Sequence, residues 1–178
     1  MLQVLKPTVA LVAIVGTVVL SEKASAVRAD DPATAELKNA SGQAVGRAHL
    51  ASTPHGVHLT VTFEKATSGD HAFHIHSVGR CDPPSFESAG DHFNPSGAQH
   101  GFLNLRGTHA GDLPNVHVPA TGKHALELFI KGLTLQGADN SLLDSDGAAL
   151  VLHSATDDYK SDPAGNAGDR IACGVIKP

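Results

Sequence analysis

The stretch that begins at residue 56 reads Gly56-Val57-His58-Leu59-Thr60-Val61-Thr62-Phe63-Glu64-Lys65, and it alternates apolar and polar side chains. Val57, Leu59, Val61 and Phe63 fall on one face, because successive side chains of a β-strand point to opposite sides. This period of two predicts a strand with one buried face. The β-branched residues of the stretch favour the same conformation.

The same alternation recurs on both sides of this stretch in short runs that are separated by turn residues. No helical periodicity lies between the runs. Eight short strands at fairly regular spacing predict an all-β domain, an eight-stranded Greek-key β-sandwich or flattened barrel. The expected strands cover residues 34–40, 43–52, 56–65, 71–78, 115–119, 123–130, 148–154 and 170–176.

Two stretches fit no strand. Residues 79–113 are rich in Gly, Pro, Asn, Ser and His, and residues 155–169 are shorter and polar. Structureless loops of this length inside a compact domain are usually functional. We therefore expect these two long functional loops to carry the site.

The N-terminal segment predicts export. Lys6 precedes an apolar run over residues 9–20, and Ala24-Ser25-Ala26 closes it with small residues, which is typical of a secretory signal peptide over residues 1–26. The alternative is a transmembrane anchor, but roughly 12–13 apolar residues fall short of the about 20 that a bilayer requires. We expect a flexible segment over 27–33, a domain over 34–178, no stable membrane insertion after signal cleavage, and a periplasmic or extracellular location.

Composition narrows the function classes. The net charge is −5 and no basic cluster is long enough to indicate nucleic-acid binding. The two cysteines, Cys81 and Cys173, favour one disulfide in an exported chain, with two free thiols as the alternative. Twelve histidines in 178 residues exceed what packing needs. Their number points to metal binding.

His74 and His76 lie two residues apart in an expected strand. Their imidazoles therefore share one face of that strand. Imidazole suits both copper and zinc. Taken alone the pair is a weak signal, because two such histidines can also be ordinary strand residues.

The long loop strengthens the metal interpretation. It carries His92, His100, His109 and Asp112 with turn residues between them. Three imidazoles and a carboxylate make a complete tetrahedral shell for zinc, and a shell with no open position indicates a structural rather than a catalytic ion. The alternative is a set of scattered polar loop residues.

His153 follows an apolar run and falls at the end of an expected strand, where its side chain can face a site built from other strands. As a single histidine it carries little weight. Asp157, four residues on, offers the carboxylate that metal-bound histidines usually need to fix their tautomer.

The stretch His71-Ala72-Phe73-His74-Ile75-His76 is similar to the copper-binding strand signature of the copper–zinc superoxide dismutases, in particular of the exported bacterial members. Residues 165–176 are similar to the C-terminal signature of that family. The stretches 90–95, 99–101 and 109–113 lie between them in the family's order and spacing. The resemblance extends from about residue 34 to residue 178.

The resemblance implies one copper and one zinc ion per chain, with an imidazolate of His92 shared between them. It implies that Asp157 links His74 to His100, that Cys81 and Cys173 form a disulfide, and that Arg170 stands beside the open face of the copper. By itself Arg170 could equally be a solvated surface charge. The implied copper ligands are His74, His76, His92 and His153, and the implied zinc ligands are His92, His100, His109 and Asp112.

The chain departs from the family pattern at three points. Ala72 replaces a glycine common in the strand signature, a change that a strand should tolerate. Cys81 falls five residues after His76, closer than in animal enzymes. The loop over residues 157–169 is short and has Lys160 as its only base, which weakens any transfer of a lysine-rich guidance scheme.

The resemblance implies an oxidoreductase that disproportionates superoxide to oxygen and hydrogen peroxide, in antioxidant defence outside the cytoplasm, with catalytic roles for Arg170 and His92. Two alternatives stay open, a non-catalytic copper or zinc carrier on the same fold and a structural zinc domain. Superoxide is the expected partner, and a homodimer and a monomer are both compatible with the sequence.

Overall fold

The computed structural model describes residues 31–137 and 140–178. The expected signal peptide over residues 1–26, and the part of the expected flexible segment up to residue 30, lie outside this range. No helix in the described part of the chain is long and apolar enough to cross a membrane.

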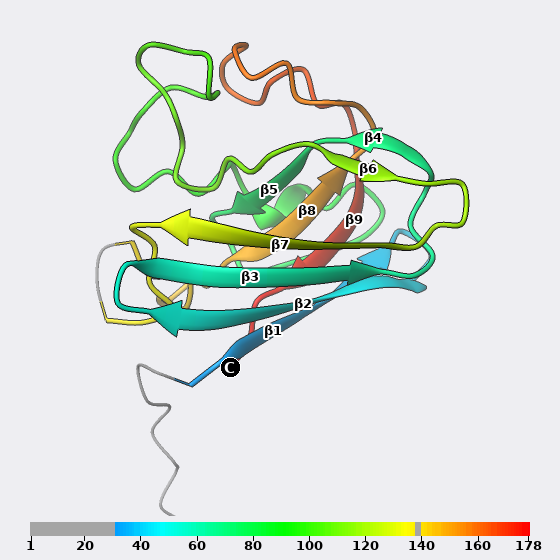
Figure 1. Ribbon diagram of the computed structural model, residues 1–178, viewed down its shortest axis with the longest axis horizontal. Coiled ribbons are helices and arrows are strands. Elements are labelled where there is room, and N and C mark those ends of the chain that lie inside the picture. Colours follow the sequence, from blue (N-terminus) through cyan, green and yellow to red (C-terminus); the bar gives the residue numbers. More distant parts are fainter. Residues whose placement is uncertain (1–30, 138–139) are drawn as a thin grey trace, which may run out of the picture.

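The described residues form nine strands and one short 3-10 helix (Figure 1). Seven strands make one curled antiparallel sheet in the order β5-β8-β9-β1-β2-β3-β7, and β4 pairs with β6. The expected all-β Greek-key fold is confirmed. The elements are β1 (Ala33–Asn39), β2 (Ala44–Thr53), β3 (Gly56–Phe63), β4 (Gly69–His71), β5 (Phe73–His76), η1 (Glu87–Ala89), β6 (Val116–Val118), β7 (His124–Lys131), β8 (Ala149–His153) and β9 (Arg170–Val175).

The stretch that begins at Gly56 forms β3, in register with β2 on one side and β7 on the other. Val57, Leu59, Val61 and Phe63 are buried as predicted. They join the inward-facing residues of β1 and β2 in one apolar cluster. Each fully buried side chain of this kind stabilises the fold by roughly 1.5–3 kcal/mol.

The eight-strand count was wrong at one place. The expected strand over residues 71–78 is two strands, because β4 pairs with β6 whereas β5 pairs with β8. Ala72 lies between them and belongs to neither strand. Its N–H donates to the carbonyl of Ala155 and its carbonyl accepts from the N–H of His153. The chain therefore changes its strand partner at Ala72, from β6 to β8.

The two long loops lie at the same edge of the molecule. The loop between β5 and β6 (green) and the loop between β8 and β9 (orange) run side by side in Figure 1, and the N–H of Leu103 donates to the carbonyl of Tyr159 at 2.9 Å. This contact brings together segments that are far apart in the sequence, so a site can form between them.

A disulfide joins Cys81 in the first loop to Cys173 in β9, with 5.7 Å between the Cα atoms. The expected pairing is confirmed. Closing a loop of this size stabilises the folded chain by roughly 4–5 kcal/mol in the chain-entropy model. A structural disulfide also favours a location outside the reducing cytoplasm.

Candidate metal centre

The long loop is held against β5 by backbone hydrogen bonds, and these bring its histidines to the strand. The N–H of Ile75 donates to Gly111 and the carbonyl of Ile75 accepts from Phe93, at 2.9 and 2.8 Å. His76 is bridged to His92 in the same way. The loop therefore acts as a backbone partner of β5, and side chains 16 or more residues apart in sequence become neighbours.

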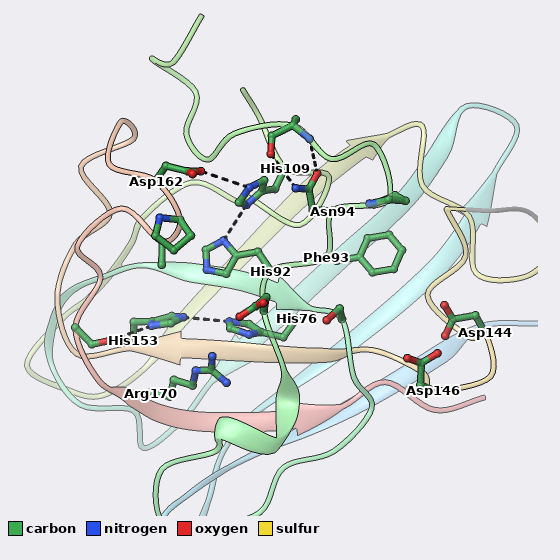
Figure 2. Close-up of a pocket in the computed structure, with 17 residues that line it drawn as sticks. His76, His92, Phe93, Asn94, His109, Asp144, Asp146, His153, Asp162 and Arg170 are labelled. Atoms are coloured by element: carbon green, nitrogen blue, oxygen red, sulfur yellow. Dashed lines mark hydrogen bonds and ion pairs between the residues drawn. The ribbon is translucent and has the colours of Figure 1, made fainter. Parts of the chain in front are cut away.

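His74, His76, His92 and His153 form one group, with one ring nitrogen of each within 4.8 Å of the others. All four are buried. The Nε2 atoms of His76 and His153 face one another at 3.4 Å (Figure 2). These are the four residues expected to hold copper, and the structure brings all of them together.

Two nitrogen atoms of this group are suited to bind a cation. His74 Nδ1 and His92 Nε2 are buried and have no hydrogen-bond partner among the described residues. A buried polar nitrogen without a partner costs free energy and is rare in native proteins. Four converging imidazole nitrogens suit a copper ion, so this donor set fits the expected metal.

His92, His100, His109 and Asp112 form the second group, also buried and within the same 4.8 Å limit. The Nδ1 atoms of the three histidines lie 3.0, 3.0 and 3.3 Å from Oδ1 of Asp112. The other carboxylate oxygen accepts hydrogen bonds from the N–H of Gly101, the N–H of His109 and the hydroxyl of Thr108. One oxygen is thus left to face the three rings, as a closed zinc shell would require.

His92 belongs to both groups. Its Nδ1 faces Asp112 and the second group, while its Nε2 is one of the two atoms of the first group that have no hydrogen-bond partner in the described structure. Figure 2 shows the ring between His76 on one side and His109 on the other. The ring centroid of His92 lies 4.1 Å from that of His74 and 5.4 Å from that of His109. Its position therefore suits a bridging imidazole.

Asp157 connects the two groups on their far side. Its carboxylate accepts from His74 Nε2 at 3.0 Å and from His100 Nε2 at 2.9 Å. The N–H of Tyr159 donates to the same carboxylate at 2.7 Å. Gly165 covers it, and a Cβ at this position would collide with both Asp157 and His100. The expected link between His74 and His100 is present in the structure.

Burial sets the protonation of the first group. It lowers the pKa of His74 to about 4, that of His76 to about 2 and that of His153 to about 3, because burial disfavours the charged imidazolium. All three rings are therefore neutral at pH 7. A neutral imidazole is the form that binds a metal ion.

In the second group, hydrogen bonds outweigh burial in setting the pKa values of His100 and Asp112. Burial lowers the pKa of His100, but hydrogen bonds to Asp112 and Asp157 outweigh it and raise the pKa to about 9. Burial raises the pKa of each carboxyl group, yet hydrogen bonds from His100 hold the pKa values of Asp112 and Asp157 below their usual range. Both carboxylates are ionised, which suits a cation.

Arg170 faces the same cavity as the first group. This cavity of about 700 Å³ is also lined by His76, His92 and His153 (Figure 2). The guanidinium donates to the carbonyl of Phe86 through Nη1 and to the carbonyl of Gly90 through Nη2, both at 2.8 Å. Arg170 is thus a half-buried cation beside the histidines. Four carboxylates also line the cavity, those of Asp91, Asp144, Asp146 and Asp162.

Sequence reasoning missed several supporting groups. Gly90 offers its carbonyl to both Arg170 and His76 Nδ1. Thr108 and Tyr159 hold the two carboxylates. No sequence signal could have identified these groups, because backbone carbonyls and loop contacts leave no mark in side-chain spacing.

The remaining histidines lie outside both groups. His71 is buried, with its ring nitrogens 2.7 and 3.0 Å from the carbonyls of His153 and Thr67, so it is a hydrogen-bonded structural residue. The other five are exposed or half-buried, namely His49, His55, His58, His117 and His124.

Fold and site together define a β-barrel metalloprotein with two adjacent metal-binding groups that share one histidine. The family model described as copper/zinc superoxide dismutase matches residues 41–176. The chain belongs to the copper/zinc superoxide dismutase family.

Known proteins support this assignment. Copper–zinc superoxide dismutase 1 of Aquifex aeolicus is 48% identical over 145 residues, covering 80% of this chain and 86% of that protein. Superoxide dismutase 2 of the same organism is 49% identical over 150 residues, covering 83% and 88%. The crystal structure of a superoxide dismutase-like protein from Bacillus subtilis matches with a TM-score of 0.77 at 39% identity, covering 81% of this chain and 97% of that one.

Proposed function

We propose that this protein disproportionates superoxide outside the cytoplasm with a copper ion held by His74, His76, His92 and His153. A zinc ion would be held by His92, His100, His109 and Asp112. The activity and the two metals follow from the family, whose members are copper- and zinc-dependent oxidoreductases. The residue roles are the part that the proposal adds.

One observation supports the residue roles above all others. The nitrogens His74 Nδ1 and His92 Nε2 are buried without a partner in the described part of the chain, and both point into the group of four histidines. A bound cation would satisfy both nitrogens at once. The facing nitrogens of His76 and His153 agree with the same occupant.

When bound, copper supplies one-electron redox chemistry, and zinc supplies a fixed positive charge. The chain's own residues supply position and protons. Conversion of two superoxide ions to oxygen and hydrogen peroxide consumes two protons, so the site needs a proton donor. His92 can hold and release one of these protons at Nε2, and solvent water supplies the other. Asp112 faces Nδ1 of the same ring and holds the ring in place.

Arg170 binds and orients the anionic substrate in this proposal. Its guanidinium carries a permanent positive charge at the cavity that the histidines line. The four carboxylates of the same cavity and the net charge of −5 oppose an anion. The attraction must therefore act locally, within about one Debye length of roughly 8–10 Å.

Export is part of the proposal. Residues 1–26 would direct secretion and be removed, which leaves a protein free of the membrane in the periplasm or outside the cell. The Cys81–Cys173 disulfide supports an oxidising destination. Mass spectrometry of the exported protein tests this by identifying its first residue, which we expect near residue 27. Sedimentation distinguishes a monomer from a homodimer.

The decisive experiment measures metal content and superoxide consumption on the same purified sample, with and without a copper chelator. We expect one copper and one zinc per chain, rapid consumption, and loss of activity when copper is removed. Both metals bound without consumption would instead favour a metal carrier. Zinc alone after copper-replete expression would favour a structural zinc domain.

A further inference from the structure

The short helix η1 connects the two carbonyls that hold Arg170. Phe86 precedes the helix and Gly90 follows it, and each carbonyl accepts one guanidinium nitrogen at 2.8 Å. A long arginine side chain has many rotamers, so its charge stays in one place only where it is held. The direction of the guanidinium therefore depends on how firmly these two carbonyls are fixed.

The Gly90 carbonyl is fixed by its surroundings. Gly90 has φ 73°, and a Cβ there would approach Val78 to 2.9 Å, so only glycine fits. The same carbonyl accepts the Nδ1 hydrogen bond of His76. Through this shared carbonyl, one nitrogen of the guanidinium is linked to His76, one of the four histidines of the first group.

The Phe86 carbonyl also accepts the N–H of Ala89 within η1, at 3.1 Å, but the backbone conformation of Phe86 itself is unfavourable. Phe86 has φ 56° and ψ 21°, a left-handed conformation that is disfavoured for a bulky residue. Its side chain is nonetheless 2% exposed and packs in a small cluster of its own. That cluster contains Ala89, Ala149, Val151 and Cys173, with Cys81 packed against it.

Burial of this ring explains why the residue keeps a disfavoured backbone conformation. Residues in such conformations persist only where the surrounding structure over-determines them. The ring packs in one cluster with two residues of β8 and the disulfide cysteines, and the carbonyl of the same residue accepts a hydrogen bond from Arg170. The N–H of Phe86 adds a bond to the carbonyl of Asp82.

We infer that Phe86 is a positioning residue for the active-site arginine: its buried ring fixes the carbonyl that aims the Arg170 guanidinium into the metal cavity. The residue touches neither substrate nor metal and acts through Arg170. The inference rests on the proposed role of Arg170 as the anion-binding group.

Azide, a small anion that binds copper, is the probe. Its dissociation constant is measured by the copper absorption of the copper- and zinc-loaded protein. We expect Phe86→Ala to weaken azide binding three- to tenfold, whereas Phe86→Leu, which keeps a buried apolar anchor, stays within twofold. Leu50→Ala is the control, because Leu50 is fully buried in the other apolar cluster. It should leave azide affinity within twofold.

A double-mutant cycle shows whether the effect passes through Arg170. In an Arg170→Ala background, Phe86→Ala should change azide affinity by less than twofold. In the otherwise unchanged protein, Phe86→Ala should also speed the modification of Arg170 by phenylglyoxal, as mapped on the peptide. If Phe86→Ala does not fold, Phe86→Gly replaces it, because glycine accepts a φ of 56° freely.

Unchanged azide affinity in Phe86→Ala, or an equal loss in the Arg170→Ala background, overturns the inference. These results are distinct from a failure of the proposed function. If Arg170→Ala itself binds azide as tightly as the unchanged protein, the role of Arg170 fails and the inference fails with it.

Discussion

At the scale of single residues, Asp157 is the point at which the two metal groups depend on one another. Its two oxygens accept from imidazoles of different groups, His74 and His100. A carboxylate can accept from both rings, whereas an amide offers one oxygen and one N–H₂. The ionised form of Asp157 is therefore what allows both rings to keep the same orientation toward the metal ions that we propose they bind.

Asp157→Asn is expected to weaken zinc binding by about 10- to 100-fold, the usual range when a carboxylate that orients a ligand is lost. The amide N–H₂ would face one ring nitrogen that already carries a proton. Competition with a chromophoric chelator measures the zinc affinity. Asp158→Asn is the matched control, since Asp158 is exposed and bonds only within its own loop. Equal zinc affinity in both variants would contradict the link.

Arg170→Ala is expected to slow superoxide consumption by about tenfold or more at low salt, because a local positive charge raises the encounter rate of an anion. Arg170→Lys should be intermediate, since an ammonium cannot reproduce the forked contact with two carbonyls. Stopped-flow decay of superoxide at several ionic strengths measures the rates. A rate for Arg170→Ala equal to that of the unchanged protein removes the residue from the mechanism.

At the scale of elements, the first long loop is attached at both of its ends. Hydrogen bonds to Ile75 hold its ligand-bearing part to β5, and the Cys81–Cys173 bond holds its beginning to β9. The histidines of the loop consequently reach their places by backbone attachment.

Replacing both cysteines, as Cys81→Ala with Cys173→Ala, is expected to lower the free energy of unfolding by about 2–5 kcal/mol. Urea unfolding of the metal-free protein measures the loss. Reduction of the unchanged protein should give a similar loss, and the variant should not respond to reductant. A variant that unfolds at the same urea concentration as the oxidised protein would show that the cross-link is dispensable.

Most of the sheet could be predicted, because alternation in stretches such as that at Gly56 reflects burial of one face directly. The division at Ala72 could not, since it arises from a change of strand partner that no local pattern encodes. The histidine groups were visible through residue type and motif order. The carbonyls of Phe86 and Gly90 were not, because any residue type carries one.

At the scale of the whole molecule, both acid and alkaline pH are expected to lower the stability of the metal-free fold. In the folded state the pKa values of His74, His76 and His153 are lowered to about 4, 2 and 3, so below about pH 6.5 the unfolded chain binds more protons and stability falls. The pKa of His100 is raised to about 9. Its contribution is complete below about pH 6.5 and is lost as the pH rises through 9.

The metal-free protein is therefore expected to be most stable near neutral pH. Its melting temperature should fall by roughly 5 °C or more between pH 6.5 and pH 5, and by a smaller amount toward pH 9. Differential scanning calorimetry measures the melting temperature over the acid limb and the alkaline limb of this pH dependence. His76→Gln should make the acid limb shallower, and an acid limb identical to that of the unchanged protein would contradict the assignment.

Tyr159 joins the two long loops, and the chain has no tryptophan and no other tyrosine. Its hydroxyl accepts from the N–H of Asn115 and its ring lies 5.3 Å from that of Phe102. Ultraviolet emission excited near 280 nm therefore comes from one ring at the junction beside the zinc group. The protein carries an intrinsic optical probe of that junction, and titration with zinc can be followed by its fluorescence with no label attached.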